Sequence, residues 1–159
     1  MKFTHINKKK EINMVDISEK KITSRVAKAK GKIKFSKSTF KKISENTSPK
    51  GEIFNTARLA GTLAAKKTNE LIPLCHNINL NLIEIQFKKY NRNSTIEVIS
   101  VVKTDYKTGV EMEALTACSV ACLTIYDMCK SIDKKIIINE IKLIFKSGGK
   151  SGNYANEDV

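Results

Sequence analysis

The sequence predicts an α+β fold in which helices pack on one face of an antiparallel sheet. Along the 159 residues the hydrophobic patterns follow the order strand, helix, two strands, helix, strand. The two middle strands are separated by a short turn, which indicates a hairpin. The second long helix is apolar nearly all round, and a helix of that kind is buried on every side. This combination is typical of ferredoxin-like folds.

The first part of the chain predicts extended segments and one short helix. Residues 14–18 have the composition of a short extended segment. Residues 22–36 form a second extended stretch, whose final third alternates between polar and apolar side chains as a half-buried strand does. Residues 38–43 suit a short helix, and residues 44–51 are dense in turn-forming residues, which predicts a loop.

A helix from residue 52 to about residue 70 has a packing face made only of small residues. Such a face lets another backbone approach closely, so this helix is expected to pack tightly on a sheet or on a partner helix. Pro73 follows and ends the helix, because proline cannot continue the hydrogen-bond pattern. The small residues are Ala57, Ala60, Gly61, Ala64 and Ala65.

The second half of the chain predicts the hairpin, the apolar helix and a last strand. Residues 80–88 alternate as a strand, residues 91–93 form the turn, and residues 95–103 are rich in the Ile and Val that strands favour. The long helix is predicted from about 109 to 131, and the last strand from 136 to 145. Because the long helix is apolar on all sides, we expect a second subunit to cover part of it, and therefore an oligomer.

We expect one domain over residues 14–153, a flexible basic arm over residues 1–13 and a flexible tail over residues 154–159. No apolar run reaches the roughly 18 residues that a membrane span requires. The N-terminus lacks the apolar stretch of a secretory signal. These observations predict a soluble, cytoplasmic protein without a membrane partner.

The formal net charge of +13 favours anionic partners, and solvated surface lysine is its simplest explanation. A polyanionic substrate is the second interpretation, and a basic RNA-binding module is a rival function. Base recognition relies on arginine, and only Arg25, Arg58 and Arg92 are present among 29 basic residues. The predicted strands also lack the clustered aromatics of an RNA platform, so no nucleic-acid partner is expected. A catalytically silent interaction subunit is a further rival. The strand aromatics are Phe35, Phe87, Tyr90 and Phe145.

The four cysteines predict neither a metal site nor disulfides. No pair has the C-x-x-C spacing of a zinc site. Cys118 and Cys129 would lie roughly 16 Å apart on one helix, too far to share a metal. Cys118, Cys122 and Cys129 are therefore interpreted as small buried apolar residues, and no metal site is predicted.

Two acidic clusters of the long helix are candidate sites. Glu111 and Glu113 occupy its first turn, where carboxylates also stabilise the helix dipole. They point to sides roughly 200° apart, so they would have different roles. Near the end of the helix, Asp127 and Lys130 are three residues apart and share a face. This pair is either a surface ion pair or a general acid–base pair.

Three further clusters suit anion binding. His76 follows Pro73 just before a strand and suits proton transfer or phosphate binding, or is a hydrogen-bonded loop histidine. Lys146 and Lys150 flank two glycines whose backbone amides can converge on an anion, unless the segment is a flexible tail. Lys50 precedes a helix N-terminus, either as an anion site or in an ordinary turn. Together these groups suit a phosphorylated substrate.

Nine motifs in one order, from residue 4 to residue 152, resemble the cyclic pyranopterin monophosphate synthase family, accessory protein C of molybdenum cofactor biosynthesis. The resemblance covers essentially the full chain. The motifs are T-H-I-N (4–7), M-V-D-I-S (14–18), K-G-E-I-F (50–54), T-A-R-L-A-G (56–61), A-A-K-K-T (64–68), L-I-P-L-C-H (71–76), T-G-V-E-M-E-A-L-T (108–116), T-I-Y-D-M-C-K (124–130) and K-S-G-G-K-S-G (146–152).

The resemblance implies a specific reaction and assembly. Family members are lyases that convert 3′,8-cyclo-7,8-dihydro-GTP, made by a radical enzyme, into cyclic pyranopterin monophosphate with release of pyrophosphate. They have a ferredoxin-like fold and form hexamers, as trimers of dimers, with active sites at subunit interfaces. No cofactor is expected to be required, although Mg²⁺ as a counter-ion of the triphosphate stays open.

The resemblance also implies roles for single residues. Asp127 would be the catalytic acid or base, with Lys130 beside it and Lys146 taking part in proton transfer. The substrate would contact Leu74, Cys75, His76, Glu111, Met112 and Glu113. Its triphosphate would be bound by Lys50, Lys146 and Lys150, with Arg25 contributing from the arm or from a neighbouring subunit.

Overall fold

The computed structural model describes residues 5–7, 9–45, 53–149 and 152–156. The predicted order of the main elements is confirmed, with element ends that differ by a few residues. In chain order the elements are β1 (Thr23–Lys34), α1 (Lys37–Ser44), α2 (Ile53–Lys66), α3 (Thr68–Leu71), β2 (Leu82–Tyr90), the 3₁₀ turn η1 (Asn91–Asn93), β3 (Thr95–Tyr106), α4 (Glu111–Cys129), β4 (Ile137–Ser147) and β5 (Tyr154–Ala155).

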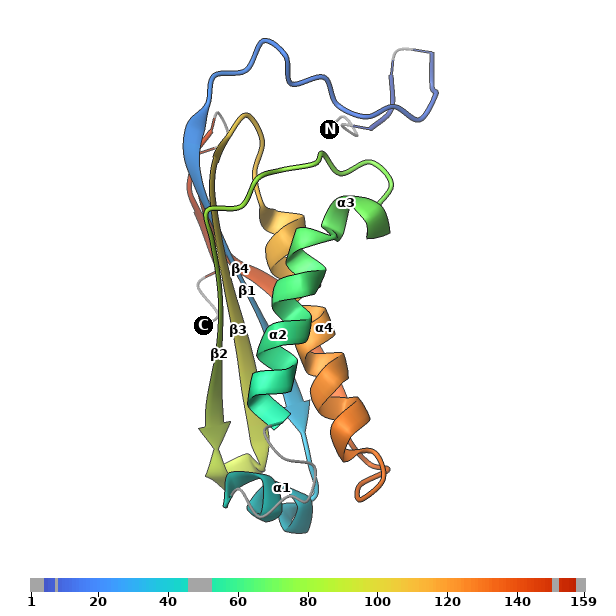
Figure 1. Cartoon of the computed structure of the whole chain (residues 1–159), viewed down its shortest axis with the longest axis vertical. Helices are drawn as coiled ribbons and strands as arrows, with labels where there is room; N and C mark the ends of the chain where they lie inside the picture. Colours follow the sequence, from blue (N-terminus) through green and yellow to red (C-terminus); the bar gives the residue numbers. More distant parts are fainter. Residues whose placement is uncertain (1–4, 8, 46–52, 150–151, 157–159) are drawn as a thin grey trace.

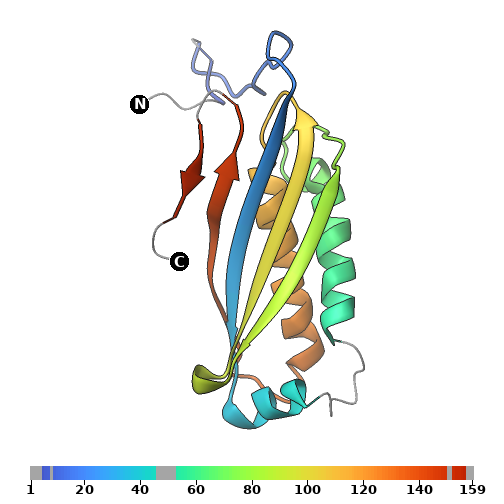
Figure 2. The ribbon, with the colours of Figure 1, turned by 90° about the vertical axis from the view of Figure 1, so that its left-hand side faces the viewer.

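The sheet has the strand order β2-β3-β1-β4-β5, and all neighbouring strands are antiparallel. Its first four strands, with α2 and α4 in the connections, form the predicted ferredoxin-like arrangement. Figure 1 shows α2 and α4 side by side on one face of the sheet, and Figure 2 shows the opposite face uncovered. The short edge strand β5, which pairs Tyr154 with Lys146, was not predicted from the sequence.

Two segments differ from the predicted secondary structure. The predicted helix over residues 52–70 is divided, because α2 ends at Lys66 and the four-residue α3 follows. Lys67 separates them, and its amide donates to both Leu63 and Ala64 carbonyls. Residues 14–18, predicted as extended, run along the molecule without belonging to a strand, and a turn begins at their end.

The core lies between the sheet and the two long helices, and its closest contact is at Gly61. A Cβ at Gly61 would collide with Ile85 Cδ1 and would lie 2.7 Å from the Ala117 carbonyl oxygen of α4. The small residues on the packing face of α2 therefore allow the close approach of another helix backbone that the sequence predicts. Buried members of that face include Ala57 and Ala65.

The helix α4 is long and apolar enough to cross a membrane by length and composition alone. It lies instead across β1, β3 and β4 and beside α2 (Figure 1). Cys118, Cys122 and Cys129 are fully buried there, and the Cys118 thiol donates to the Val98 carbonyl at 3.6 Å. The apolar character of α4 is therefore that of a core helix, and the prediction of small buried cysteines is confirmed.

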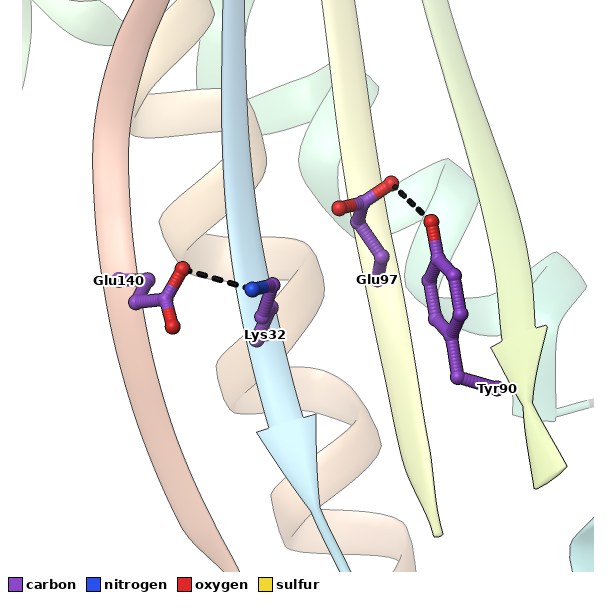
Figure 3. Close-up of polar contacts among 4 residues, drawn as sticks. All are labelled: Lys32, Tyr90, Glu97 and Glu140. Atoms are coloured by element: carbon purple, nitrogen blue, oxygen red, sulfur yellow. Dashed lines mark hydrogen bonds and ion pairs between the residues drawn. The ribbon is translucent and has the colours of Figure 1, made fainter. Parts of the chain in front are cut away.

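The uncovered face of the sheet carries polar contacts rather than an aromatic platform. Lys32 pairs with Glu140 at 2.8 Å, and the Tyr90 hydroxyl donates to Glu97 at 3.2 Å (Figure 3). Phe87, an aromatic that the RNA-binding rival would need, packs against Phe54 of α2 with 4.9 Å between ring centroids. This arrangement does not favour base stacking on the sheet.

Candidate functional site

A pocket of about 420 Å³ gathers most of the predicted site at one end of the molecule. Four segments meet there: the N-terminal segment before β1, the loop between α3 and β2, the start of α4 with the residues just before it, and the end of β4. The predicted residues that line it are Leu74, Cys75, His76, Glu111, Met112, Glu113 and Lys146. The same pocket is also lined by His5, Val15, Lys20, Ile78, Thr108 and Gly109, none of which was predicted as a site residue.

The loop that carries Leu74, Cys75 and His76 is held at both ends. Near its start the Cys75 amide donates to the Ile72 carbonyl at 3.0 Å, just after α3 ends. Near its end the Thr104 hydroxyl of β3 donates to the Asn79 carbonyl at 2.6 Å. The loop that presents the three motif residues to the pocket is thus tied down on both sides, between the end of α3 at Leu71 and the start of β2 at Leu82.

The His76 side chain holds the N-terminal segment against this loop. Its Nε2 lies 2.8 Å from the Val15 carbonyl oxygen. Because a carbonyl only accepts, Nε2 carries the proton in this contact. The structure therefore supports the interpretation of a hydrogen-bonded loop histidine, and it also places His76 in the pocket wall.

Glu111 and Lys146 form an ion pair at the pocket, with 3.1 Å between Lys146 Nζ and Glu111 Oε1. Both side chains are about one third exposed, at 30% and 29%. Glu111 begins α4, where its charge also favours the helix dipole. Gly109 precedes the helix, and a Cβ there would overlap the Glu111 carboxylate. Glycine at this position leaves the carboxylate room to reach Lys146.

Glu113 is a carboxyl group of a different kind, because only 4% of the residue is exposed. Burial raises the pKa of Glu113 to about 7, with an added contribution from the charge of nearby Glu111 and an opposing one from a backbone hydrogen bond. Burial also raises the pKa of the Cys75 thiol, with the charge of Glu113 adding to the effect. A carboxyl group with a pKa near 7 can both give and take a proton at neutral pH. Glu111 and Glu113 therefore differ in burial, and their different roles stay a prediction.

Arg25, a predicted site residue, does not line this pocket, and its side chain lies against the glycine turn that follows β4. Gly148 and Gly149 have φ values of +92° and +80°, which side chains on L-residues rarely adopt. A Cβ at Gly149 would overlap the Arg25 guanidinium. The guanidinium donates to the Lys107 carbonyl at 3.3 Å. The two glycines of the K-S-G-G motif therefore lie against the Arg25 side chain, where a larger residue would not fit.

The second predicted pair, Asp127 and Lys130, lies at the other end of α4. Lys130 Nζ is 2.6 Å from Asp127 Oδ1, and the two side chains are 58% and 69% exposed. The hydrogen bond that Lys130 donates to Asp127 raises the pKa of Lys130. At a rise of 1.5 Å per residue, Asp127 is about 24 Å from Glu111 along the helix. One copy of the chain therefore does not bring this pair into its own pocket.

Lys50 and Lys150, predicted as phosphate ligands, lie outside the described residues. Within the described ranges, no group of three or more His, Cys, Asp or Glu side chains is arranged to hold a metal ion.

The chain is similar to known proteins along nearly its whole length. The model of the MoaC family matches residues 14–149. The chain is 51% identical over 152 residues to the cyclic pyranopterin monophosphate synthase of Clostridium acetobutylicum, covering 96% of this chain and 94% of that protein. It is 48% identical over 155 residues to the enzyme of the same name from Heliobacterium modesticaldum, covering 98% of each.

A third relative, the cyclic pyranopterin monophosphate synthase of Peptoclostridium acidaminophilum, is 46% identical over 159 residues, covering 100% of both chains. The family model covers every residue that lines the pocket except His5. This chain belongs to the MoaC family.

Proposed function

We propose that this chain is a cyclic pyranopterin monophosphate synthase, which converts 3′,8-cyclo-7,8-dihydro-GTP to cyclic pyranopterin monophosphate and pyrophosphate in molybdenum cofactor biosynthesis. The observation that carries the proposal is the pocket in which Cys75, His76, Glu111, Glu113 and Lys146 converge. Relatives of nearly the same length carry the name of this enzyme at about half identity.

Closing the cyclic phosphate requires charge stabilisation at the phosphates. A hydroxyl oxygen of the substrate attacks the α-phosphorus, the bond from that phosphorus to the bridging β-oxygen breaks, and pyrophosphate leaves with its electron pair. The hydroxyl proton passes to a base. Lys146 is held at the pocket by Glu111 at 3.1 Å, so its charge is already in place when negative charge develops. Lys50, Lys150 and Arg25 are proposed to bind the same phosphates.

The ring rearrangement requires proton transfers, and Glu113 is suited to them. Its pKa of about 7 places both protonation states within reach at neutral pH. Leu74, Cys75 and Met112 line the same pocket and are proposed to contact the purine-derived ring. Glu111 then acts mainly by holding Lys146.

Asp127 and Lys130 are proposed to enter the site of a second copy of the chain. They are paired and exposed, and at the helical rise Asp127 lies about 24 Å and Lys130 about 28 Å from Glu111. An active site shared between copies accounts for a catalytic pair that faces away from its own pocket. We propose a homohexamer, built as a trimer of dimers. Large apolar side chains exposed on α2 and α4 favour burial against another copy; they include Leu59, Leu63 and Leu123, at 62%, 50% and 57% exposure.

The reaction as proposed needs no cofactor from the protein, and Mg²⁺ would serve only as a counter-ion of the triphosphate. The substrate is a purine-derived triphosphate rather than a nucleic acid, and the enzyme works in the cytoplasm without a membrane partner.

A coupled assay tests the proposed reaction. The purified protein receives the product of a radical GTP cyclase, and pyrophosphate is measured together with a pterin-type fluorophore after oxidation. We expect both products in equal amounts from the wild type and neither from a folded Asp127→Asn variant. Glu84→Gln, an exposed carboxylate of β2, is the matched control and should keep full activity. Absence of both products from a folded, oligomeric wild type would contradict the proposal.

A further inference from the structure

The N-terminal segment, described over residues 5–7 and 9–20, lies against the pocket although it precedes the first strand. Figure 1 shows this segment passing over the end of the molecule that carries α3 and the start of α4. His5, Val15 and Lys20 line the pocket together with the motif residues of the domain. We propose that His5 and Lys20 bind the anionic end of the substrate, an inference that rests on the proposed function.

Two hydrogen bonds from the domain fix the second half of the segment. His76 Nε2 donates to the Val15 carbonyl at 2.8 Å, and Lys107 Nζ donates to the Ser18 carbonyl at 2.7 Å. Between these points, Asp16 Oδ1 accepts from the Ser18 amide at 2.8 Å and from its hydroxyl at 2.7 Å. The backbone just before Lys20 is therefore held at two places by the domain and at one by its own side chains.

The first half of the segment folds back on itself and thereby positions His5. Ile6 and Ile12 form a β-bridge. The Asn13 amide donates to the His5 carbonyl at 3.0 Å, and His5 Nδ1 lies 3.3 Å from the Asn13 carbonyl oxygen. Because a carbonyl only accepts, Nδ1 is the donor in this contact, and Nε2 stays available for a ligand.

The charge balance of the pocket explains why further cations are useful. Lys146 is paired with Glu111, and Glu113 adds a second carboxyl group. A triphosphate brought into this pocket meets acidic groups as well as basic ones, so binding it needs positive charge from elsewhere. In the described part of the chain, the Lys20 ammonium forms no ion pair. Lys20 therefore can supply a charge that no carboxylate of the pocket already uses.

The test compares two neighbouring lysines. Lys20→Met keeps the length of the side chain and removes its charge, and Lys21→Met makes the same change at an exposed residue that does not line the pocket. Binding of inorganic pyrophosphate to the full-length protein is measured by titration calorimetry, and KM and kcat are measured in the coupled assay. We expect Lys20→Met to weaken pyrophosphate binding and raise KM by about tenfold, as loss of one charge-assisted contact does. Lys21→Met should behave as the wild type.

Two further variants separate ligand binding from a structural role. Lys20→Arg retains the charge and should restore most of the binding, which a purely structural contact would not require. His5→Ala should raise KM more than it lowers kcat. If the wild type is active but Lys20→Met and His5→Ala match it in pyrophosphate affinity and KM, the inference is wrong and the proposed function stands. If the wild type shows no turnover, the proposed function fails, and the pyrophosphate titrations alone decide the inference.

Discussion

Lys146 and Glu111 form an ion pair, 3.1 Å long, that joins the end of strand β4 to the first turn of helix α4. The two residues are 35 positions apart and come from separate motifs of the sequence. A partly exposed pair of this kind contributes only about 0–1 kcal/mol to stability. Its consequence is therefore one of position: the carboxylate fixes the ammonium at the wall of the pocket, where a phosphate can reach it.

Replacement of Glu113 by glutamine should change how stability depends on pH. Burial raises the pKa of Glu113 from 4.5 to about 7, so the folded protein holds this proton more tightly than the unfolded chain. The stabilising effect is complete below pH 4.5 and is lost as the pH rises through 7. In the wild type this loss amounts to about 3 kcal/mol, whereas Glu113→Gln has no such group.

Chemical denaturation at several pH values measures this effect. The free energy of unfolding of Glu113→Gln minus that of the wild type should grow by about 3 kcal/mol between pH 4 and pH 8. Glu84→Gln, at an exposed position of β2, is the control and should show a difference that is flat or nearly so. A flat difference for Glu113→Gln as well would contradict the raised pKa of Glu113.

Gly61→Ala should destabilise the fold despite the better helix propensity of alanine. An exposed helical glycine replaced by alanine gains about 1 kcal/mol. Here the added methyl group would collide with Ile85 Cδ1 and lie 2.7 Å from the Ala117 carbonyl oxygen. We expect a net loss of about 1–3 kcal/mol in the free energy of unfolding, since overpacking outweighs propensity.

A second substitution identifies the source of that loss. Ile85→Val removes the colliding methyl group, so Gly61→Ala should cost less in the Ile85→Val background than in the wild type. The cost should not vanish, because the Ala117 backbone stays in place. Equal costs in the two backgrounds would show that Ile85 is not the obstacle.

The cysteines should differ sharply in their reactivity toward iodoacetamide. Cys118, Cys122 and Cys129 are fully buried, and Cys75 is partly exposed at the pocket. Burial and the charge of Glu113 raise the pKa of the Cys75 thiol, and a thiol with a raised pKa reacts slowly. At pH 8 we expect mass spectrometry to find slow labelling at Cys75 alone in the folded protein and all four sites labelled after unfolding. Rapid labelling of a helix cysteine in the folded state would contradict the packing of α4.

Most of the fold could be predicted because the hydrophobic pattern changes period at each element. The alternation along residues 22–36 and the all-round apolar stretch of α4 are local signals, and both elements form where expected. The break at Lys67 was not predicted, because helix-forming residues continue through it and only the Lys67 and Thr68 hydrogen bonds show the change. The strand β5 was not predicted because it pairs with β4 through only two residues, too few to show a strand pattern in the sequence.

The part of the candidate site that lies in residues 71–76 and 108–116 could be predicted from the sequence, and the part that the N-terminal segment supplies could not. Residues 74–76 and 111–113 lie in motifs that the resemblance assigns to substrate binding, and the pocket contains them. His5 lies in the motif T-H-I-N, to which the resemblance assigned no role, and Lys20 lies in none of the nine motifs. Only the contacts of Val15 with His76 and of Ser18 with Lys107 place the segment at the pocket.

The claim that the site is shared between two copies of the chain is tested most directly by mixing subunits. Asp127→Asn and Lys146→Ala should each abolish turnover, because each removes one half of every site. If the halves come from different copies, dissociating and reassembling the two variants together restores both native halves in about a quarter of the sites. The mixed sample should therefore recover about a quarter of wild-type turnover.

The control mixes Asp127→Asn with a chain that carries both substitutions, which regenerates no native site and should stay inactive. Native mass spectrometry checks that mixed oligomers have formed. Recovery near a quarter in the first mixture and none in the second is the result that a shared site predicts. No recovery in oligomers shown to contain both variants would mean that Asp127 and Lys146 of different copies do not meet, and would contradict the shared site.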